Sequence, residues 1–197
     1  RRICAQDYVA SWLDDDGGVG GVARGDGCGS ADGDKPGGRS TSGAPPCEDV
    51  VTLAASAGAR LLRAAQIDPG RIGMLLVATE TGVDHSKPVA AFLHGILGLP
   101  QACRVYEAKH ACFGGTAGVL TATDWIASGS SRGRTALVIC TDIARYGLKS
   151  PGEPTQGAGA VAMLISENPR MLALDVGTSG SYSQDVHDFW RPLYSKE

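Results

Sequence analysis

Apolar residues recur at helical spacing in three stretches of the chain. The stretch 48–65 has an apolar side chain on every turn and predicts an amphipathic helix. A second helix is predicted over 88–97, where Pro88 fits the first helical turn. The third covers 111–128.

Short, mostly apolar segments alternate with these helices. Residues 72–78 form a continuous apolar run, which is typical of a strand buried on both faces. Four further strands are predicted over 103–107, 135–141, 158–165 and 171–176. Strands that alternate with helices favour an α/β fold, with a mixed, largely parallel sheet covered by helices.

The first 46 residues differ from the rest. Eleven glycines fall between Gly17 and Gly43, mixed with Asp, Ser and Pro. Such a stretch buries too little apolar surface to offset its ordering entropy, so we expect a flexible loop over 14–46, after a short helix at 8–13. The spacing of a calcium loop is absent, and no metal site is predicted. Residues 47–197 then form the folded unit.

The composition excludes several classes of protein. The 197 residues are 43% hydrophobic and 20% charged, which suits a single globular domain. A net charge of −3 provides no basic field for nucleic acid or an anionic membrane. No apolar run is long enough to span a bilayer, and the start at Arg1 without Met or a signal stretch indicates a processed or truncated end. We expect a cytoplasmic protein.

The chain has six cysteines, none in a Cys-x-x-Cys pair or a zinc-type cluster with histidine. Free thiols are therefore expected. Cys140 lies inside an apolar strand and is interpreted as a small buried hydrophobe.

Cys112 lies between a predicted strand and a predicted helix. Unpaired N–H groups and the helix dipole favour a thiolate at a helix start, which would lower the pKa of this thiol and make it a nucleophile. A buried structural thiol is the alternative. Gly114, Gly115 and Gly118 follow, and each costs about 1 kcal/mol relative to alanine in a helix. Their presence predicts that the helix backbone packs closely against other elements.

Several segments, in order from about Pro46 to Pro192, resemble the hydroxymethylglutaryl-CoA synthase family. They are 77–87, 107–117, 142–147, 152–160 and 185–192, the last containing Asp-Phe-Trp-Arg-Pro. The variants Gly-Glu-Pro-Thr-Gln-Gly and Asp-Phe-Trp are similar to bacterial members.

The resemblance implies the N-terminal half of a thiolase-like fold. It also implies a Claisen-type condensation, in which acetyl-CoA acylates a cysteine and the acetyl group then attacks acetoacetyl-CoA. The product would be 3-hydroxy-3-methylglutaryl-CoA, a mevalonate-pathway precursor of isoprenoids. The CoA thioesters would be substrates, with no further cofactor, and a homodimer would be expected.

Matched position by position, the resemblance implies that Cys112 is the nucleophile and Glu80 the general acid/base. Supporting or substrate-binding roles are implied for Asp142, Asp188, Phe189, Thr155 and Tyr146. Glu80 directly follows a buried strand, where desolvation can hold a proton near neutral pH. Without the motif around it, Glu80 would be interpreted as part of a loop salt bridge.

The chain departs from the family pattern in three ways. Phe113 stands where the family usually has Tyr, a strand is expected before Arg1, and the family's catalytic His belongs to a second half expected beyond Glu197. The chain's four histidines are not assigned as the base; they are His85, His94, His110 and His187.

Three alternatives follow from the resemblance. One is an inactive half-domain that needs a partner chain to supply the second half. Another is a polyketide β-branching synthase that acts on carrier-protein thioesters. A ketoacyl synthase is disfavoured, because Glu80 lies in a Thr-Glu-Thr context where that family uses His and Asn with the cysteine.

Overall fold

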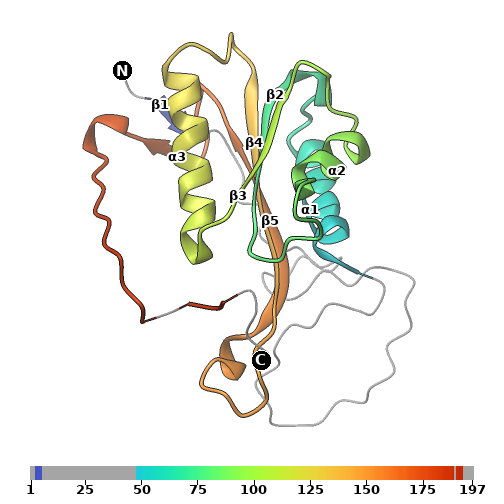
Figure 1. The fold of residues 1–197 in the computed structure, drawn as a ribbon. Coiled ribbons are helices and arrows are strands. Elements are labelled where there is room, and N and C mark those ends of the chain that lie inside the picture. The colour runs from blue at the N-terminus through green and yellow to red at the C-terminus, as the bar shows by residue number, and fades with distance from the viewer. Residues whose placement is uncertain (1–2, 6–47, 189, 193–197) are drawn as a thin grey trace.

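A four-stranded mixed sheet forms the centre of the computed structural model (Figure 1). Its strands are β2 (Ile72–Ala78), β3 (Arg104–Ala108), β4 (Thr135–Ala144) and β5 (Gly157–Ile165), in the order β3-β2-β4-β5. β2 runs parallel to both β3 and β4, whereas β5 is antiparallel to β4. The predicted strands of this sheet are confirmed.

The structure describes residues 3–5, 48–188 and 190–192. The helix predicted at 8–13 and the loop predicted at 14–46 lie outside these residues, as does Phe189.

The sheet separates two layers of helices. α1 (Val50–Ala64) and α2 (Val89–Ile96) cover one face, and α3 (Gly114–Ala127) lies on the other (Figure 1). α1 begins at a capping box, in which Asp49 Oδ1 accepts the Thr52 N–H at 2.8 Å and Thr52 Oγ1 accepts the Asp49 N–H at 2.9 Å. The three helices occur where the apolar periodicity predicted them, with Pro88 capping α2 instead of lying inside it.

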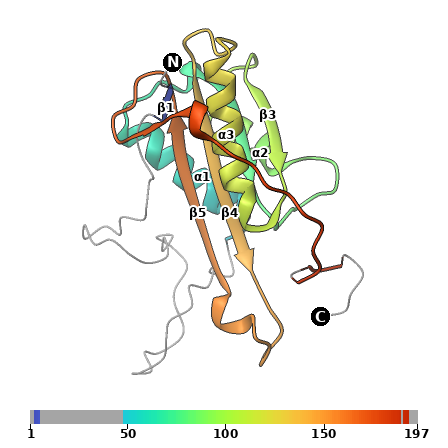
Figure 2. The same cartoon turned by 90° about the vertical axis from the view of Figure 1, so that its left-hand side faces the viewer.

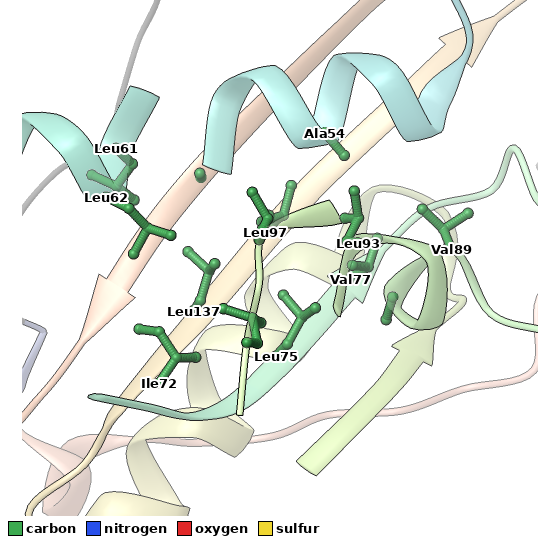
Figure 3. Close-up of a cluster of buried hydrophobic side chains, with 14 of the residues drawn as sticks. Ala54, Leu61, Leu62, Ile72, Leu75, Val77, Val89, Leu93, Leu97 and Leu137 are labelled. Atoms are coloured by element: carbon green, nitrogen blue, oxygen red, sulfur yellow. The ribbon is translucent and has the colours of Figure 1, made fainter. Parts of the chain in front are cut away.

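Each face of the sheet has its own apolar core. All seven residues of β2 are buried, because side chains from both faces of this strand meet a helix layer. The cluster under α1 and α2 is drawn in Figure 3 and includes Leu61, Leu75, Leu93 and Leu137. The cluster under α3 includes Leu76, Trp125 and Val138.

β2 and β3 end level with each other, whereas β4 continues past them to Ala144. Ala78 near the end of β2 pairs with Ala108 of β3 and with Cys140 of β4. The chain segments that leave these strands therefore begin at the same edge of the sheet.

The structure corrects two sequence expectations. The segment predicted as one helix over 111–128 begins as a 3-10 turn, Ala111–Phe113, before α3. In addition, β6 (Leu172–Leu174) does not join the main sheet but pairs antiparallel with β1 (Ile3–Ala5). The strand predicted over 171–176 is thus present but shorter, and its partner β1 is too short to show a periodicity in the sequence.

The segment after β6 returns along the molecule. It is drawn in red and runs along the outer side of α3, away from the sheet (Figures 1 and 2). No helix in the described part of the chain combines the length and apolar character required to cross a membrane.

Candidate active site

The predicted nucleophile and the predicted acid/base residue share one edge of the sheet. Glu80 follows β2 by two residues, and Cys112 follows β3 by four. The Thr79 N–H donates to the Ala108 carbonyl at 3.2 Å, which joins the two exits directly. The ends of parallel strands are where α/β proteins commonly place their sites.

Asp142 of β4 holds the Glu80 loop in place. Its Oδ1 accepts the backbone N–H of Glu80 at 2.8 Å and that of Thr81 at 3.1 Å. The same oxygen accepts the hydroxyls of Thr79 and Thr81, each at 3.0 Å. Hydrogen bonds to a charged acceptor are stronger than those between neutral groups. Asp142 therefore fixes the backbone on which Glu80 is mounted.

The sequence analysis did not identify Thr79 and Thr81, which support the Glu80 loop. The Thr81 N–H donates to Thr79 Oγ1 at 2.9 Å, and Thr81 Oγ1 accepts the Ile143 N–H at 3.1 Å. They bind Asp142 on both sides of Glu80. The alternation Thr-Glu-Thr at the end of a buried strand is the signal that could have revealed them.

Cys112 lies in the 3-10 turn that leads into α3 and is an exposed, free thiol. The N–H groups of Phe113 and Gly114 both donate to the His110 carbonyl, at 2.9 and 3.0 Å. The rings of His110 and Phe113 meet edge to face on either side of Cys112, with centroids 5.2 Å apart. The turn thus holds the thiol at the surface, just before the first residue of the α-helix.

α3 approaches the sheet closely through its glycines. A Cβ atom on Gly115 would lie 2.6 Å from Cys140 Sγ, and one on Gly118 would lie 2.7 Å from Leu76 Cδ2. Both distances are far shorter than carbon and sulfur atoms tolerate. The expectation that these glycines allow close backbone packing is confirmed, and that packing fixes the height of Cys112 above the strand ends.

Glu107 of β3 supports a neighbouring helix. Its Oε2 accepts the Val89 N–H at 2.7 Å, at the first residue of α2. Pro88, the N-cap residue of α2, has no side-chain acceptor. Glu107 of β3 therefore accepts a helix N–H that a cap residue normally accepts.

Arg191, far along the chain, reaches Glu80. Its Nη2 lies 2.7 Å from Glu80 Oε2, and its guanidinium carbon is 5.5 Å from the centroid of the half-buried Tyr146 ring. The sequence segment containing Arg191 was recognised, but no role was assigned to this side chain. The loop salt bridge that was the plain interpretation of Glu80 is present.

The remaining predicted residues are spread more widely. Thr155 is exposed in a short turn, with its hydroxyl donating to the Gly152 carbonyl at 2.7 Å. Within the described residues, no hydrogen bond joins the exposed Asp188 side chain to Glu80 or Cys112. His94 lies 3.1 Å from the Pro100 carbonyl, a contact that closes the turn after α2. The roles of Asp188 and Thr155 stay predictions.

Two other thiols differ from Cys112 in their surroundings. Burial raises the pKa of the Cys103 thiol to about 11. Burial also raises the pKa of Cys140, and the charge of Asp142 adds to this effect. Both side chains therefore favour the neutral thiol. Among the described residues, no group of three or more His, Cys, Asp and Glu side chains could hold a metal ion.

Comparisons with known proteins find relatives of this chain in both sequence and structure. The family model of the hydroxymethylglutaryl-coenzyme A synthase N-terminal region matches residues 38–170. Hydroxymethylglutaryl-CoA synthase of Enterococcus faecalis is 45% identical over 148 residues, which cover 75% of this chain and 37% of the relative. A polyketide biosynthesis 3-hydroxy-3-methylglutaryl-ACP synthase of Bacillus subtilis is 38% identical over 163 residues, covering 77% of this chain and 39% of the relative.

Solved structures show the same likeness. The structure of MvaS in complex with 3-hydroxy-3-methylglutaryl coenzyme A superposes with a TM-score of 0.75 at 58% identity, over 78% of this chain and 37% of that one. The predicted thiolase-like fold is confirmed by such neighbours. This chain spans a little over a third of the length of these relatives. It belongs to the hydroxymethylglutaryl-CoA synthase family and corresponds to the N-terminal part of its members.

Proposed function

We propose that this protein is a hydroxymethylglutaryl-CoA synthase that uses Cys112 as nucleophile and Glu80 as general acid/base. The observation that carries this proposal is the common edge of the sheet. There, the turn bearing Cys112 and the loop bearing Glu80 leave strands that are paired in register. A thiol and a carboxylate held by separate rigid elements suit a two-step reaction.

In the first step, the Cys112 thiolate attacks the carbonyl carbon of acetyl-CoA. The carbon–sulfur bond to CoA breaks, acetyl-Cys112 forms, and CoA leaves with the proton that the Cys112 thiol gave up. The exposed position of Cys112 gives a thioester access to the thiol. The backbone N–H of Cys112 is the donor that we expect this chain to offer to the developing oxyanion.

In the second step, Glu80 accepts a proton from the acetyl methyl group. The resulting carbanion bonds to the ketone carbon of acetoacetyl-CoA, and Glu80 returns the proton to the ketone oxygen. Water then hydrolyses the bond to Cys112, so that the product takes the hydroxide and the thiol regains its proton. Asp142 holds the Glu80 backbone throughout, and the bond between its Oδ1 and the Glu80 N–H is 2.8 Å.

A synthase acting on carrier-protein thioesters is the second candidate. The relative from Bacillus subtilis is named for such a substrate, and a curacin-pathway synthase, solved with a holo donor-ACP, is 38% identical with a TM-score of 0.70. Both substrates present the same thioester to the cysteine. The mevalonate-pathway role, the homodimer and the absence of a further cofactor stay predictions.

The test uses the 197-residue chain fused to the part of the Enterococcus faecalis synthase that follows its matched segment. Incubation with acetyl-CoA should add one acetyl group to the peptide containing Cys112, as measured by mass spectrometry. Cys112→Ala should abolish this adduct, whereas Cys103→Ala should retain it.

Adding acetoacetyl-CoA should then release a six-carbon product as its CoA thioester. A fusion that acetylates equally fast with Cys112→Ala would overturn the proposal. A fusion that acetylates but condenses only with an acetoacetyl carrier protein would support the second candidate. A folded fusion that forms no adduct at all would favour the inactive half-domain.

A further inference from the structure

A chain of three side chains ends on Glu80. The Arg191 guanidinium carbon lies 5.5 Å from the centroid of the Tyr146 ring, and Arg191 Nη2 reaches Glu80 Oε2 at 2.7 Å. Tyr146 follows β4, while Glu80 follows β2. Arg191 comes from the C-terminal segment that follows β6. Three separate parts of the chain therefore meet at the Arg191 guanidinium.

The Tyr146 ring also packs against Gly152 of its own loop. A Cβ atom on Gly152 would lie only 2.9 Å from Cδ1 and Cγ of the ring, so the backbone at this position packs directly against it. Gly152 belongs to the same β4–β5 connection as Tyr146, which packs the ring against its own loop. The ring thus provides a fixed platform for the guanidinium.

The ion pair between Arg191 and Glu80 contributes little to the stability of the fold, which points to another role. The side chains of Arg191 and Glu80 are 31% and 24% exposed, and ion pairs open to solvent are weak because water screens them. An arginine is nevertheless well suited to orient a carboxylate. Its planar group bonds along defined directions and stacks on aromatic rings, whereas a lysine ammonium does neither as well.

We propose that Arg191 is a positioning residue for the reaction, which orients the Glu80 carboxylate and is itself held by the Tyr146 ring. This inference rests on the proposed function of Glu80. Asp142 fixes the backbone of Glu80, whereas Arg191 fixes the end of its side chain. Proton transfer depends steeply on such alignment, since a misplacement of about 1 Å can reduce a rate by about 10²-fold.

The test compares Arg191→Ala, Arg191→Lys and the control Arg104→Ala, an exposed arginine at the start of β3. Each is made in the 197-residue chain fused to the remainder of the Enterococcus faecalis synthase. We measure acetyl-Cys112 formation, the kcat and KM of condensation, and the midpoint of urea unfolding. Acetylation by the parent fusion tests the proposed function independently.

Arg191→Ala should acetylate at the parent rate but lose roughly 10- to 100-fold in condensation kcat, with little change in KM for acetoacetyl-CoA and in the unfolding midpoint. Arg191→Lys should recover part of the loss. Arg104→Ala should match the parent. Condensation by Arg191→Ala at the parent rate would overturn the proposal, and faster condensation would show that Arg191 blocks Glu80.

A double-mutant cycle separates orientation from a general effect. If Arg191 acts through Glu80, adding Arg191→Ala to Glu80→Gln should reduce condensation no further. Tyr146→Phe keeps the ring and should lose less condensation kcat than Tyr146→Leu, which should reproduce part of the Arg191→Ala loss. Fully additive losses in the cycle, with equal rates for the two Tyr146 variants, would contradict the assigned mechanism.

Discussion

Asp142 Oδ1 lies 2.8 Å from the backbone nitrogen of Glu80, although Asp142 lies within β4 and Glu80 follows β2. The same oxygen accepts three further hydrogen bonds from the residues on either side of Glu80. One carboxylate oxygen of β4 thereby determines where the chain turns after β2.

Replacing Asp142 by Ala should destabilise the fold. The substitution leaves the N–H group of Glu80 without its acceptor and removes one of the two acceptors of the Thr81 N–H, and an unsatisfied, partly buried donor costs about 1–3 kcal/mol. Asp142→Asn keeps an acceptor oxygen and should cost less. Urea unfolding of the 197-residue chain gives both values. The exposed Asp124→Ala serves as the control, and an equal loss in that variant would contradict the assigned role.

Glu80→Gln should separate the two chemical steps. Acetylation needs the thiol, whereas condensation also needs a group that accepts and returns a proton. In the fusion with the Enterococcus faecalis remainder, condensation should therefore fall by about 10²–10⁴-fold while acetyl-Cys112 still forms. Rapid quenching and mass spectrometry follow each step. The exposed Glu167→Gln is the matched control, and equal losses in both steps would remove Glu80 from this role.

Alanine at Gly118 should destabilise the protein despite its higher helix propensity. The new methyl group would lie 2.7 Å from Leu76 Cδ2, and overpacking of this kind costs about 1–3 kcal/mol. Gly95 in α2 has open space around it, so Gly95→Ala should instead stabilise by about 0.5–1 kcal/mol. Thermal or urea unfolding compares the two. Similar effects in the two variants would show that the close approach is not limiting.

Thiol reagents should discriminate among three cysteines. Cys112 is exposed, while burial raises the pKa of Cys103 to about 11. At pH 8, a thiol with that pKa is ionised to roughly one part in a thousand. Peptide mapping after brief iodoacetamide treatment should therefore find Cys112 alkylated well before Cys103 and Cys140. Faster labelling of Cys140 would contradict the packing under α3.

Stability should decrease in alkaline solution because of Cys103. The folded state keeps this thiol protonated to about pH 11, whereas the unfolded chain releases the proton near the ordinary value of 9.0. The unfolded state is therefore favoured increasingly as pH rises from about 9 to about 11. The slope of unfolding free energy against pH should be shallower in Cys103→Ala over this range. An unchanged slope would exclude Cys103 as its source.

The regular elements could be predicted from local patterns, but the contacts that complete the site could not. The continuous apolar run 72–78 predicted a strand buried on both faces, and all seven of its residues are buried in the structure. The glycines in the first turns of α3 predicted a close contact, because their cost in a helix needs compensation. In both cases the signal lies within a few neighbouring residues.

The pairing of Arg191 with Glu80 gives no such local signal in the sequence. The two residues are 111 positions apart, and neither side chain differs in its local pattern from an ordinary surface charge. The pairing of β6 with β1 was likewise missed, since Ile3–Ala5 is too short to show alternation. Contacts of this type depend on how the whole chain folds back, which a local reading of periodicity does not contain.

The glycine contact of α3 also has a consequence for how the protein tolerates change. Gly115 packs on Cys140 and Gly118 packs on Leu76. The size of these two side chains therefore sets the distance between the sheet and the helix that follows Cys112. A larger side chain at position 140 or 76 moves α3 away from the sheet and displaces the Cys112 thiol with it. Substitutions in the middle of the sheet, with no atom near a substrate, should therefore alter catalysis as directly as those at its edge.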